Sequence, residues 1–400
     1  MTSAIKSNIS KGRARVRLSK SAKKLRRSLL RLLREQGFTL GRQYELKARG
    51  SSKKSVRAVH AHFRKDRLLE EKEYVREWYP RISHYFASGT DIDPQRIDPY
   101  PVLVQKNEEH AALFRIASLW WSIPVSRGYG RRFRILIFDR SNGKLFGLLA
   151  LTDPVFNLKT RDAWIGWDVR MRENRLSHVM DACVLGAVPP YNNLLGAKFI
   201  SLLAASDFTR KLFKRRYGNK KSIIRKRNFD GRLALVTTTS ALGTSSILNR
   251  LRFRSVELFR PVGFTEGYGH FHLANGTFEK IRAYLTSCKD KEVRRYKFGK
   301  GPNYRIRVVR RALERLNLPP ELLRHGIRRG VYVAPLARNT TEFLNGHASR
   351  LSWYQRPLSE IVKFWRERWL IPRASRDNSY LSFDACAWRK TLDLNIRRDE

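Results

Sequence analysis

Residues 179–198 read VMDACVLGAVPPYNNLLGAK, and this stretch decides the fold class. The run from His178 to Val188 is short and largely apolar, which predicts a buried strand. The pair Pro189-Pro190 ends the strand, because proline cannot donate to a strand ladder. Apolar residues recur at helical spacing from Leu194 to Arg216, so a helix follows. A strand that leads into a helix and then into further strands predicts a mixed α/β fold.

A hairpin is predicted before this stretch. Phe133–Phe138 and Lys144–Leu151 are apolar runs, and residues 139–143 between them read DRSNG. Asn-Gly tolerates the positive φ of a tight turn, so the two runs are expected to pair as antiparallel strands. Further strands are predicted at Asp162–Asp168, Leu233–Thr239, Phe259–Phe264 and Gly269–Leu273.

The order hairpin, strand, helix, strand, helix, strand is similar to that of the GNAT acyltransferase fold. In that fold the central strand splays from its neighbour, and the N-terminus of the following helix binds the pyrophosphate of coenzyme A. Free backbone N–H groups and the helix dipole supply the attraction. We therefore predict a GNAT-like α/β core with flanking helices over residues 101–288. A basic helical N-terminal region, residues 1–100, precedes it, and a basic, mostly helical C-terminal region, residues 289–400, follows it.

The candidate cofactor loop is residues 192–198, NNLLGAK. The usual GNAT loop is Gln/Arg-x-x-Gly-x-Gly/Ala. Asn193 stands at the Gln/Arg position, Gly196 matches, Ala197 follows it, and Lys198 replaces the second small residue. Lys198 would either crowd a phosphate or bind one. An ordinary helix start with one glycine explains the same residues, so the cofactor stays unassigned.

The candidate catalytic segment is residues 263–272, GFTEGYGHFH. Alternation along a strand would place Glu266, Tyr268, His270 and His272 on one face. Carboxylate, phenol and imidazole groups in a row are suited to proton transfer. Ligation of a metal by the histidines and Glu266 is one alternative, although we predict no metal site. Hydrogen-bonded structural histidines are the other.

Charge dominates the composition. The 400 residues include 82 Lys and Arg against 35 Asp and Glu, a net charge of +47. Such a field attracts polyanions, so nucleic acid is the first partner to consider and an anionic membrane the second. The alternative is a basic surface that is only solvated.

The cysteines and the hydropathy indicate in which compartment the protein is expected. Cys183, Cys288 and Cys386 lie far apart, which argues against a disulfide framework or a zinc finger and fits a reducing cytoplasm. No apolar run approaches the roughly 18 residues that span a bilayer. We expect a cytoplasmic protein with no membrane partner.

Basic residues cluster in three places. A helix from Ser21 is predicted to carry cations opposite a leucine face, and Ser55–Arg67 is a second helix that could join it in a helix-turn-helix-like N-terminal region. The other clusters are residues 210–232, around the end of the helix near Arg216, and residues 289–329, where Tyr296, Phe298 and Tyr304 lie among the cations. DNA is the first nucleic acid to test, with RNA the alternative. The predicted contacts are Lys23, Lys24, Arg26, Arg27, Arg131, Arg132, Lys214, Arg215, Arg216, Lys220, Lys221, Arg225, Lys226 and Arg227.

Long strings of the sequence resemble the DruA family of the bacterial Druantia anti-phage defence system. Among them are GKLFGLLALTDPVFN at 143–157, RDAWIGWD at 161–168, VMDACVLGAVPPYNNLLGAK at 179–198 and GFTEGYGHFHL at 263–273. The resemblance covers nearly the whole chain. It implies a bacterial defence protein with a large helicase-like partner, and a core of unknown function that carries no agreed catalytic residues. The expected function is nucleic-acid binding within that system. The alternatives are an acyltransferase and a scaffold that recruits a helicase or nuclease.

Overall fold

The computed structural model describes residues 17–42, 44–48, 50, 52–123, 125, 128–221, 228–273, 276–290 and 304–388. The chain forms two compact units, which we call the small unit (residues 1–51 and 267–327) and the sheet unit (residues 52–266 and 328–400). The three ranges predicted from the sequence are bounded differently from these units and remain a prediction. The chain leaves the small unit after residue 51 and returns to it at residue 267, so segments of all three ranges share one unit.

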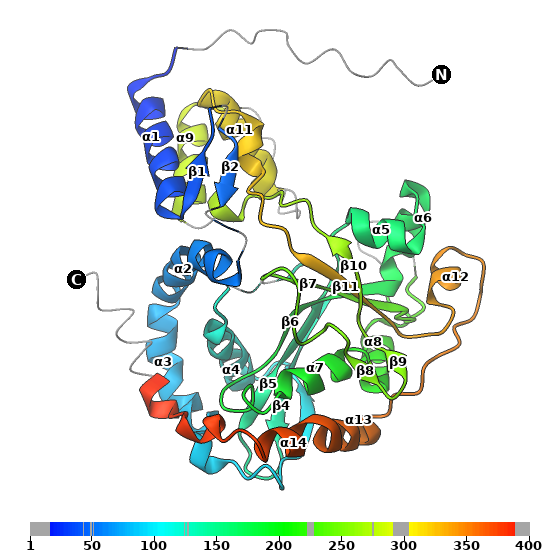
Figure 1. The fold of residues 1–400 in the computed structure, drawn as a ribbon. Helices are drawn as coiled ribbons and strands as arrows, with labels where there is room; N and C mark the ends of the chain where they lie inside the picture. The colour runs from blue at the N-terminus through cyan, green and yellow to red at the C-terminus, as the bar shows by residue number, and fades with distance from the viewer. Residues whose placement is uncertain are drawn as a thin grey trace. The chain divides into compact units, whose positions relative to one another are not determined.

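A seven-stranded sheet forms the centre of the sheet unit (Figure 1). The strand order is β10-β11-β7-β6-β5-β4-β3. Neighbours are antiparallel except β6 and β7, which are parallel, so the predicted mixed α/β class is confirmed. The strands are β3 (Pro99–Leu103), β4 (Arg132–Asp139), β5 (Leu145–Thr152), β6 (Val179–Ala187), β7 (Leu235–Ser240), β10 (Arg260–Phe264) and β11 (Gly330–Pro335).

The predicted hairpin is present as β4 and β5. The Asp139 N–H donates to the Lys144 carbonyl at 2.8 Å, and Gly143 has φ +71° in the turn, as the Asn-Gly signal required. Every residue of β5 is buried, because helices cover both faces of the sheet.

The central strand β6 separates from β7 along its length. The two strands pair only from Val179 to Asp181 of β6. Beyond that point the Thr238 hydroxyl of β7 donates to the Ala182 carbonyl at 2.8 Å, so a side-chain hydrogen bond replaces the backbone hydrogen bonds between the two strands. On the other edge of β6, Ala150 pairs with Val184 and Leu151 with Ala182, which leaves Cys183 as the extra residue of a β-bulge.

Helices pack on both faces of the sheet (Figure 1). One face carries α7 (Gly196–Ala204) and α13 (Leu358–Trp365), where the fully buried Trp365 contacts the rings of Phe146 and Phe199. The opposite face is covered by α3 (Lys72–Ile82) and α4 (Glu108–Ala117), and α2 (Lys53–Glu70) precedes them. The remaining helices of this unit are α5 (Lys159–Ile165), α6 (Val169–Arg175), α8 (Asp207–Tyr217), α12 (Thr340–Leu344) and α14 (Ile371–Ala374).

Three predicted elements are wrong in type or extent. The helix expected from Leu194 to Arg216 is two helices, α7 and α8, because Ser206 caps the second and its hydroxyl accepts from the Thr209 N–H. The strand expected at Asp162–Asp168 is mostly the helix α5, which ends at Gly166 with φ +86°. The strand expected at Gly269–Leu273 is instead a 3₁₀ turn at Phe271–Leu273.

In the residues that the structure describes, the small unit combines three α-helices and a short hairpin. They are α1 (Lys20–Glu35), β1 (Phe38–Leu40), β2 (Leu46–Ala48), α9 (Gly276–Ser287) and α11 (Tyr304–Arg315). Ser19 caps α1, and the helix buries Ala22, Leu25, Leu29 and Leu33. The predicted apolar face is therefore confirmed. The helix predicted at Ser55–Arg67 is α2, which belongs to the sheet unit. The helix-turn-helix-like pairing of α1 with α2 remains a prediction.

Candidate nucleic-acid interface

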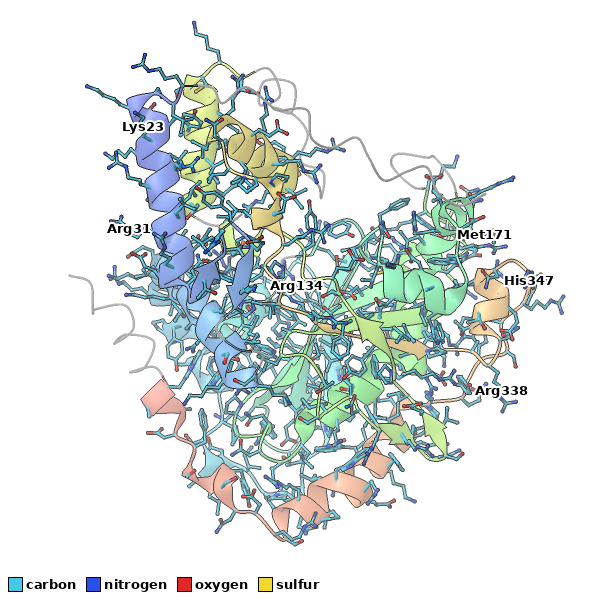
Figure 2. The ribbon with its side chains drawn as sticks, turned by 45° about the horizontal axis from the view of Figure 1, so that its top comes forward. Lys23, Arg31, Arg134, Met171, Arg338 and His347 are labelled. Carbon is cyan, nitrogen blue, oxygen red and sulfur yellow. The ribbon has the colours of Figure 1, made fainter. Side chains whose placement is uncertain are left out.

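The exposed face of α1 is the first basic cluster of the described residues. The helix carries seven lysines and arginines and one acid, Glu35. Lys23, Lys24 and Arg27 are exposed, and none of them forms an ion pair within the described residues. Lys23 and Arg31 point outward from α1 (Figure 2). Because the leucines face the small unit, the cations gather on the opposite, solvent side.

Arg26, although predicted as a contact, has a structural role within the small unit. Its guanidinium donates to the carbonyls of Leu316 and Asn317, both at 2.8 Å, and to the Tyr44 hydroxyl at 2.6 Å. These carbonyls follow the C-terminal end of α11, where backbone acceptors need donors. The hydrogen bonds of Arg26 are therefore satisfied by protein.

The second basic cluster lies at the C-terminal end of α8 in the sheet unit. Lys214, Arg215 and Arg216 occupy its last turn, where cations also compensate the helix dipole. Lys220 and Lys221 follow and are exposed. Backbone hydrogen bonds from Asn219 to Phe229 and from Phe229 to Lys220 hold this segment. The other predicted contacts, Arg225, Lys226 and Arg227, lie outside the described residues.

Arg131 and Arg132 differ although they are adjacent. Arg131 forms a 2.7 Å ion pair with Asp153, donates to the Ser177 carbonyl and lies over the Phe229 ring, so it is structural. Arg132 begins β4 and is exposed. Of these two arginines, only Arg132 has a side chain that a ligand in solution could contact.

The four candidate catalytic residues do not share a strand face. Glu266 is the last residue of the sheet unit before the chain enters the small unit, and it lies 3.7 Å from Lys159 in an exposed pair. Tyr268 is exposed and its hydroxyl accepts from Arg310 at 2.7 Å. Burial, followed by the nearby Arg305, lowers the pKa of His270. A catalytic role for these residues remains a prediction.

His272 is a buried residue of the small-unit core. Its Nε2 lies 2.7 Å from the Leu322 carbonyl, which can only accept, so Nε2 carries the proton. Its ring packs against Phe38 and His325. Burial lowers the pKa of His272 to about 4, and the imidazole is therefore neutral at pH 7.

Acidification is expected to destabilise the small unit through His272. Its pKa in the folded state lies below the usual histidine value of 6.5, so this contribution to stability is complete above pH 6.5 and is lost as the pH falls toward about 4. The slope is at most about 1.4 kcal/mol per pH unit. Urea unfolding at pH 7 and pH 5 should give a smaller difference for His272→Gln than for wild type. The control is His347→Gln, which changes an exposed histidine; an unchanged pH difference in His272→Gln would contradict the prediction.

The start of α7, which contains the candidate cofactor loop, is covered by the chain itself. Gly196 and Ala197 are buried. The Trp365 indole donates to the Leu195 carbonyl at 3.2 Å, and Arg373 donates to the carbonyl of Asn193 at 3.1 Å.

Lys198 lies under the same C-terminal segment. Its ammonium is 5.1 Å from the centroid of the Trp369 ring, and burial followed by Arg368 lowers its pKa. The packing around position 196 is by itself a sufficient reason for a glycine there. A cofactor role for Asn193, Gly196, Ala197 and Lys198 remains a prediction.

Gly196→Ala is expected to lower the free energy of unfolding by about 1–3 kcal/mol through overpacking. A Cβ there would lie 2.8 Å from both the Phe146 ring and the Tyr191 carbonyl oxygen. Denaturant unfolding measures the loss, with Asn192→Ala as the control because Asn192 is an exposed neighbour in the same loop. Wild-type stability in Gly196→Ala would mean that packing does not require the glycine.

Within the described residues, no group of three or more His, Cys, Asp or Glu side chains is placed to hold a metal ion. In the same residues no helix is long and apolar enough to cross a membrane.

A family model described as Druantia protein DruA matches residues 50–346. The chain is also 39% identical over 360 residues to a protein named Druantia protein DruA from Escherichia coli strain UMEA 4076-1, and the alignment covers 89% of each chain. No solved structure matches the chain.

Proposed function

Because this chain belongs to the DruA family of Druantia proteins, we propose that it is a nucleic-acid-binding component of a bacterial anti-phage defence system. The observation that supports binding is the exposure of cations without counter-charges. Lys23, Lys24 and Arg27 on α1, and Lys214 and Arg215 on α8, are exposed and lack ion pairs in the described part of the chain.

Unpaired surface cations are suited to phosphate. A duplex carries condensed counterions. Each lysine or arginine that pairs with a phosphate releases a counterion into solution, and the entropy of that release favours binding. The net charge of +47 makes this gain large for any polyanion. The two clusters differ in setting: α1 is a helix face of the small unit, and the α8 cluster is a helix end followed by a short loop of the sheet unit. We propose that both bind the sugar–phosphate backbone, and that specificity for a sequence is not their role.

We further propose that the sheet unit has a GNAT-like core. The support is the separation of β6 from β7, the bulge at Cys183 and the helix α7 that follows β6. The buried start of α7 does not favour acyl transfer, since the N–H groups of Leu195, Gly196 and Lys198, which a pyrophosphate would need as donors, donate to carbonyls of the same loop. We therefore propose binding rather than acyl-CoA chemistry for this chain.

The test is binding of the full-length protein, freed of co-purified nucleic acid, to single- and double-stranded DNA and RNA over a salt series. The proposal predicts a linear fall of the logarithm of the association constant with the logarithm of salt concentration, with a slope of about −0.9 per duplex phosphate neutralised. A preference for one form would name the substrate class. No binding to any of the four at low salt would contradict the proposal.

A further inference from the structure

A cavity of about 520 Å³ lies in the sheet unit, on the face of the sheet that α3 and α4 cover. Strands β4, β5 and β6 contribute to its floor, and α2, α3 and α4 contribute to its walls. The volume is within the usual range for small-molecule sites, which is about 300–1,000 Å³. Its lining includes six residues that can contact a ligand through a charge or an aromatic ring: Arg67, Tyr74, Phe114, Arg115, Arg132 and Arg134.

The charge of this lining is positive. Among the described residues that line it, four are arginines and none is an aspartate or glutamate. Arg67 and Arg115 both pair with the buried Glu71, at 2.8 Å and 2.5 Å, and Arg67 also lies 3.9 Å from Glu70. These two carboxylates can balance Arg67 and Arg115, so the excess positive charge of the lining comes from the arginines of β4, above all Arg134.

Arg134 is the least expected member of the set. It lies on β4, a strand that is otherwise mostly buried and apolar, and it is labelled in Figure 2. No ion pair or side-chain hydrogen bond joins it to another described residue, and its guanidinium lies 5.6 Å from the centroid of the Phe114 ring. Burial, followed by the charge of Arg132, lowers its pKa. A half-buried arginine without a protein acceptor costs stability, and a ligand anion would remove that cost.

The aromatic lining indicates what else the ligand carries. Arg115 stacks on the Tyr74 ring at 3.7 Å, and Phe114 faces Arg134. Guanidinium planes and aromatic rings that alternate in this way form surfaces for a flat, π-bonded group such as a nucleobase. Thr152, also in the lining, already accepts from the Tyr129 N–H and donates to the Tyr129 carbonyl, so it fixes the wall.

We propose that this cavity binds one nucleotide, with Arg134 and Arg132 on its phosphate and Tyr74, Phe114 and Arg115 beside its base. The site goes beyond the binding of nucleic acid by surface cations. A free nucleotide and the phosphorylated end of a nucleic-acid strand present the same chemistry, and the experiment separates these two sources.

The test uses isothermal titration calorimetry on the full-length, nucleic-acid-free protein, with ATP as one probe and a 5′-phosphorylated single-stranded tetranucleotide as the other. Arg134→Gln removes one of the four arginine charges of the lining. Ala111→Phe fills the cavity from α4 and keeps every arginine. The control is Arg338→Gln, an exposed arginine that Figure 2 shows on the rim of the sheet unit, away from Arg134.

We expect wild type and Arg338→Gln to bind one of the probes equally, and both cavity variants to bind it at least about tenfold more weakly. Binding of ATP would identify a free nucleotide, and binding of the tetranucleotide alone a strand end. Binding of neither probe to wild type, or equal binding by wild type, Arg134→Gln and Ala111→Phe, would overturn the proposal.

Thermal unfolding without ligand separates loss of the site from loss of the fold. Because Arg134 has no described acceptor, Arg134→Gln should unfold at the wild-type temperature or above it. If Arg134→Gln unfolds at a lower temperature than wild type, the comparison of probe binding between wild type and Ala111→Phe decides the outcome. Affinity for a long duplex should be unchanged in Arg134→Gln, so failure of the cavity proposal and failure of surface binding give different results.

Discussion

Replacing Lys23, Lys24 and Arg27 together by alanine is expected to weaken duplex binding about 500-fold at 0.1 M salt. Each lost phosphate contact removes about 0.9 from the slope of log affinity against log salt, which is close to tenfold at this salt concentration. The fold should be unaffected, because all three side chains are exposed and α1 is held by its buried leucines. Fluorescence anisotropy with one labelled duplex over a salt series measures both the affinity and the slope.

The matched control for the α1 variant neutralises Arg252, Arg338 and Arg350, three exposed arginines of the sheet unit outside both proposed clusters. It changes the net charge equally and should alter the slope much less. If the two triple variants lose the same affinity, the protein attracts nucleic acid through its overall charge, and α1 is not a defined contact surface.

The second large effect is expected at Arg161, which has a side chain with 0% exposure. Its guanidinium pairs with Asp162 at 2.6 Å and donates to the carbonyls of Val155 and Phe156. Asp162 also pairs with Arg172 at 3.1 Å. Removing one member of a buried ion network leaves the other charges uncompensated, which typically costs about 3–5 kcal/mol.

Arg161→Ala should therefore lower the free energy of unfolding by about 3–5 kcal/mol in denaturant titrations. Arg170→Ala is the control, since Arg170 is exposed on the neighbouring helix α6 and should change stability by less than about 0.5 kcal/mol. A loss below about 1 kcal/mol in Arg161→Ala would show that the buried ion pair contributes little to the free energy of unfolding.

The string RDAWIGWD thus has a structural explanation. Arg161 and Asp162 form the buried network, Gly166 ends α5 with φ +86°, and the Trp167 indole donates to the Leu344 carbonyl at 2.9 Å. None of these contacts requires a ligand. The sequence alone predicted a strand here because the run is short and apolar, and such runs fit a strand or a buried helix equally well.

The hairpin β4–β5 and the strand β6 could be predicted because their signals are local. Asn142-Gly143 determines a tight turn, and the apolar runs on both sides leave little choice of partner. The pairing of β11 between β7 and β10 joins residues that are 66 to 100 positions apart, and no local pattern in the sequence predicts it.

The predicted row of catalytic groups failed as a strand for a local reason. Gly263, Gly267 and Gly269 interrupt residues 263–272, and Gly263 and Gly267 have positive φ. The chain therefore turns after β10 rather than continuing extended, and only one isolated bridge, Tyr268 to Arg324, forms there among the described residues. Alternation of side chains applies to a regular strand, so it could not place these groups on one face.

The cavity arginines were missed, although the sequence contains one signal for them. Arg134 interrupts the apolar run FRILIF of β4, and a charged residue inside a central strand is costly unless it has a partner or a ligand. The other three come from α2, α4 and the start of β4. Their meeting depends on how the helices pack on the sheet, which spacing along the chain does not reveal.

The measurement that tests the central claim most directly is lysine footprinting with and without bound DNA. Acetylation followed by mass spectrometry reports each lysine separately, so it shows where phosphate lies and not only that the protein binds. The account predicts strong protection of Lys23, Lys24, Lys214, Lys220 and Lys221, and none at Lys363, which is exposed on α13. Protection that is absent from all five, or equal at Lys363, would contradict it.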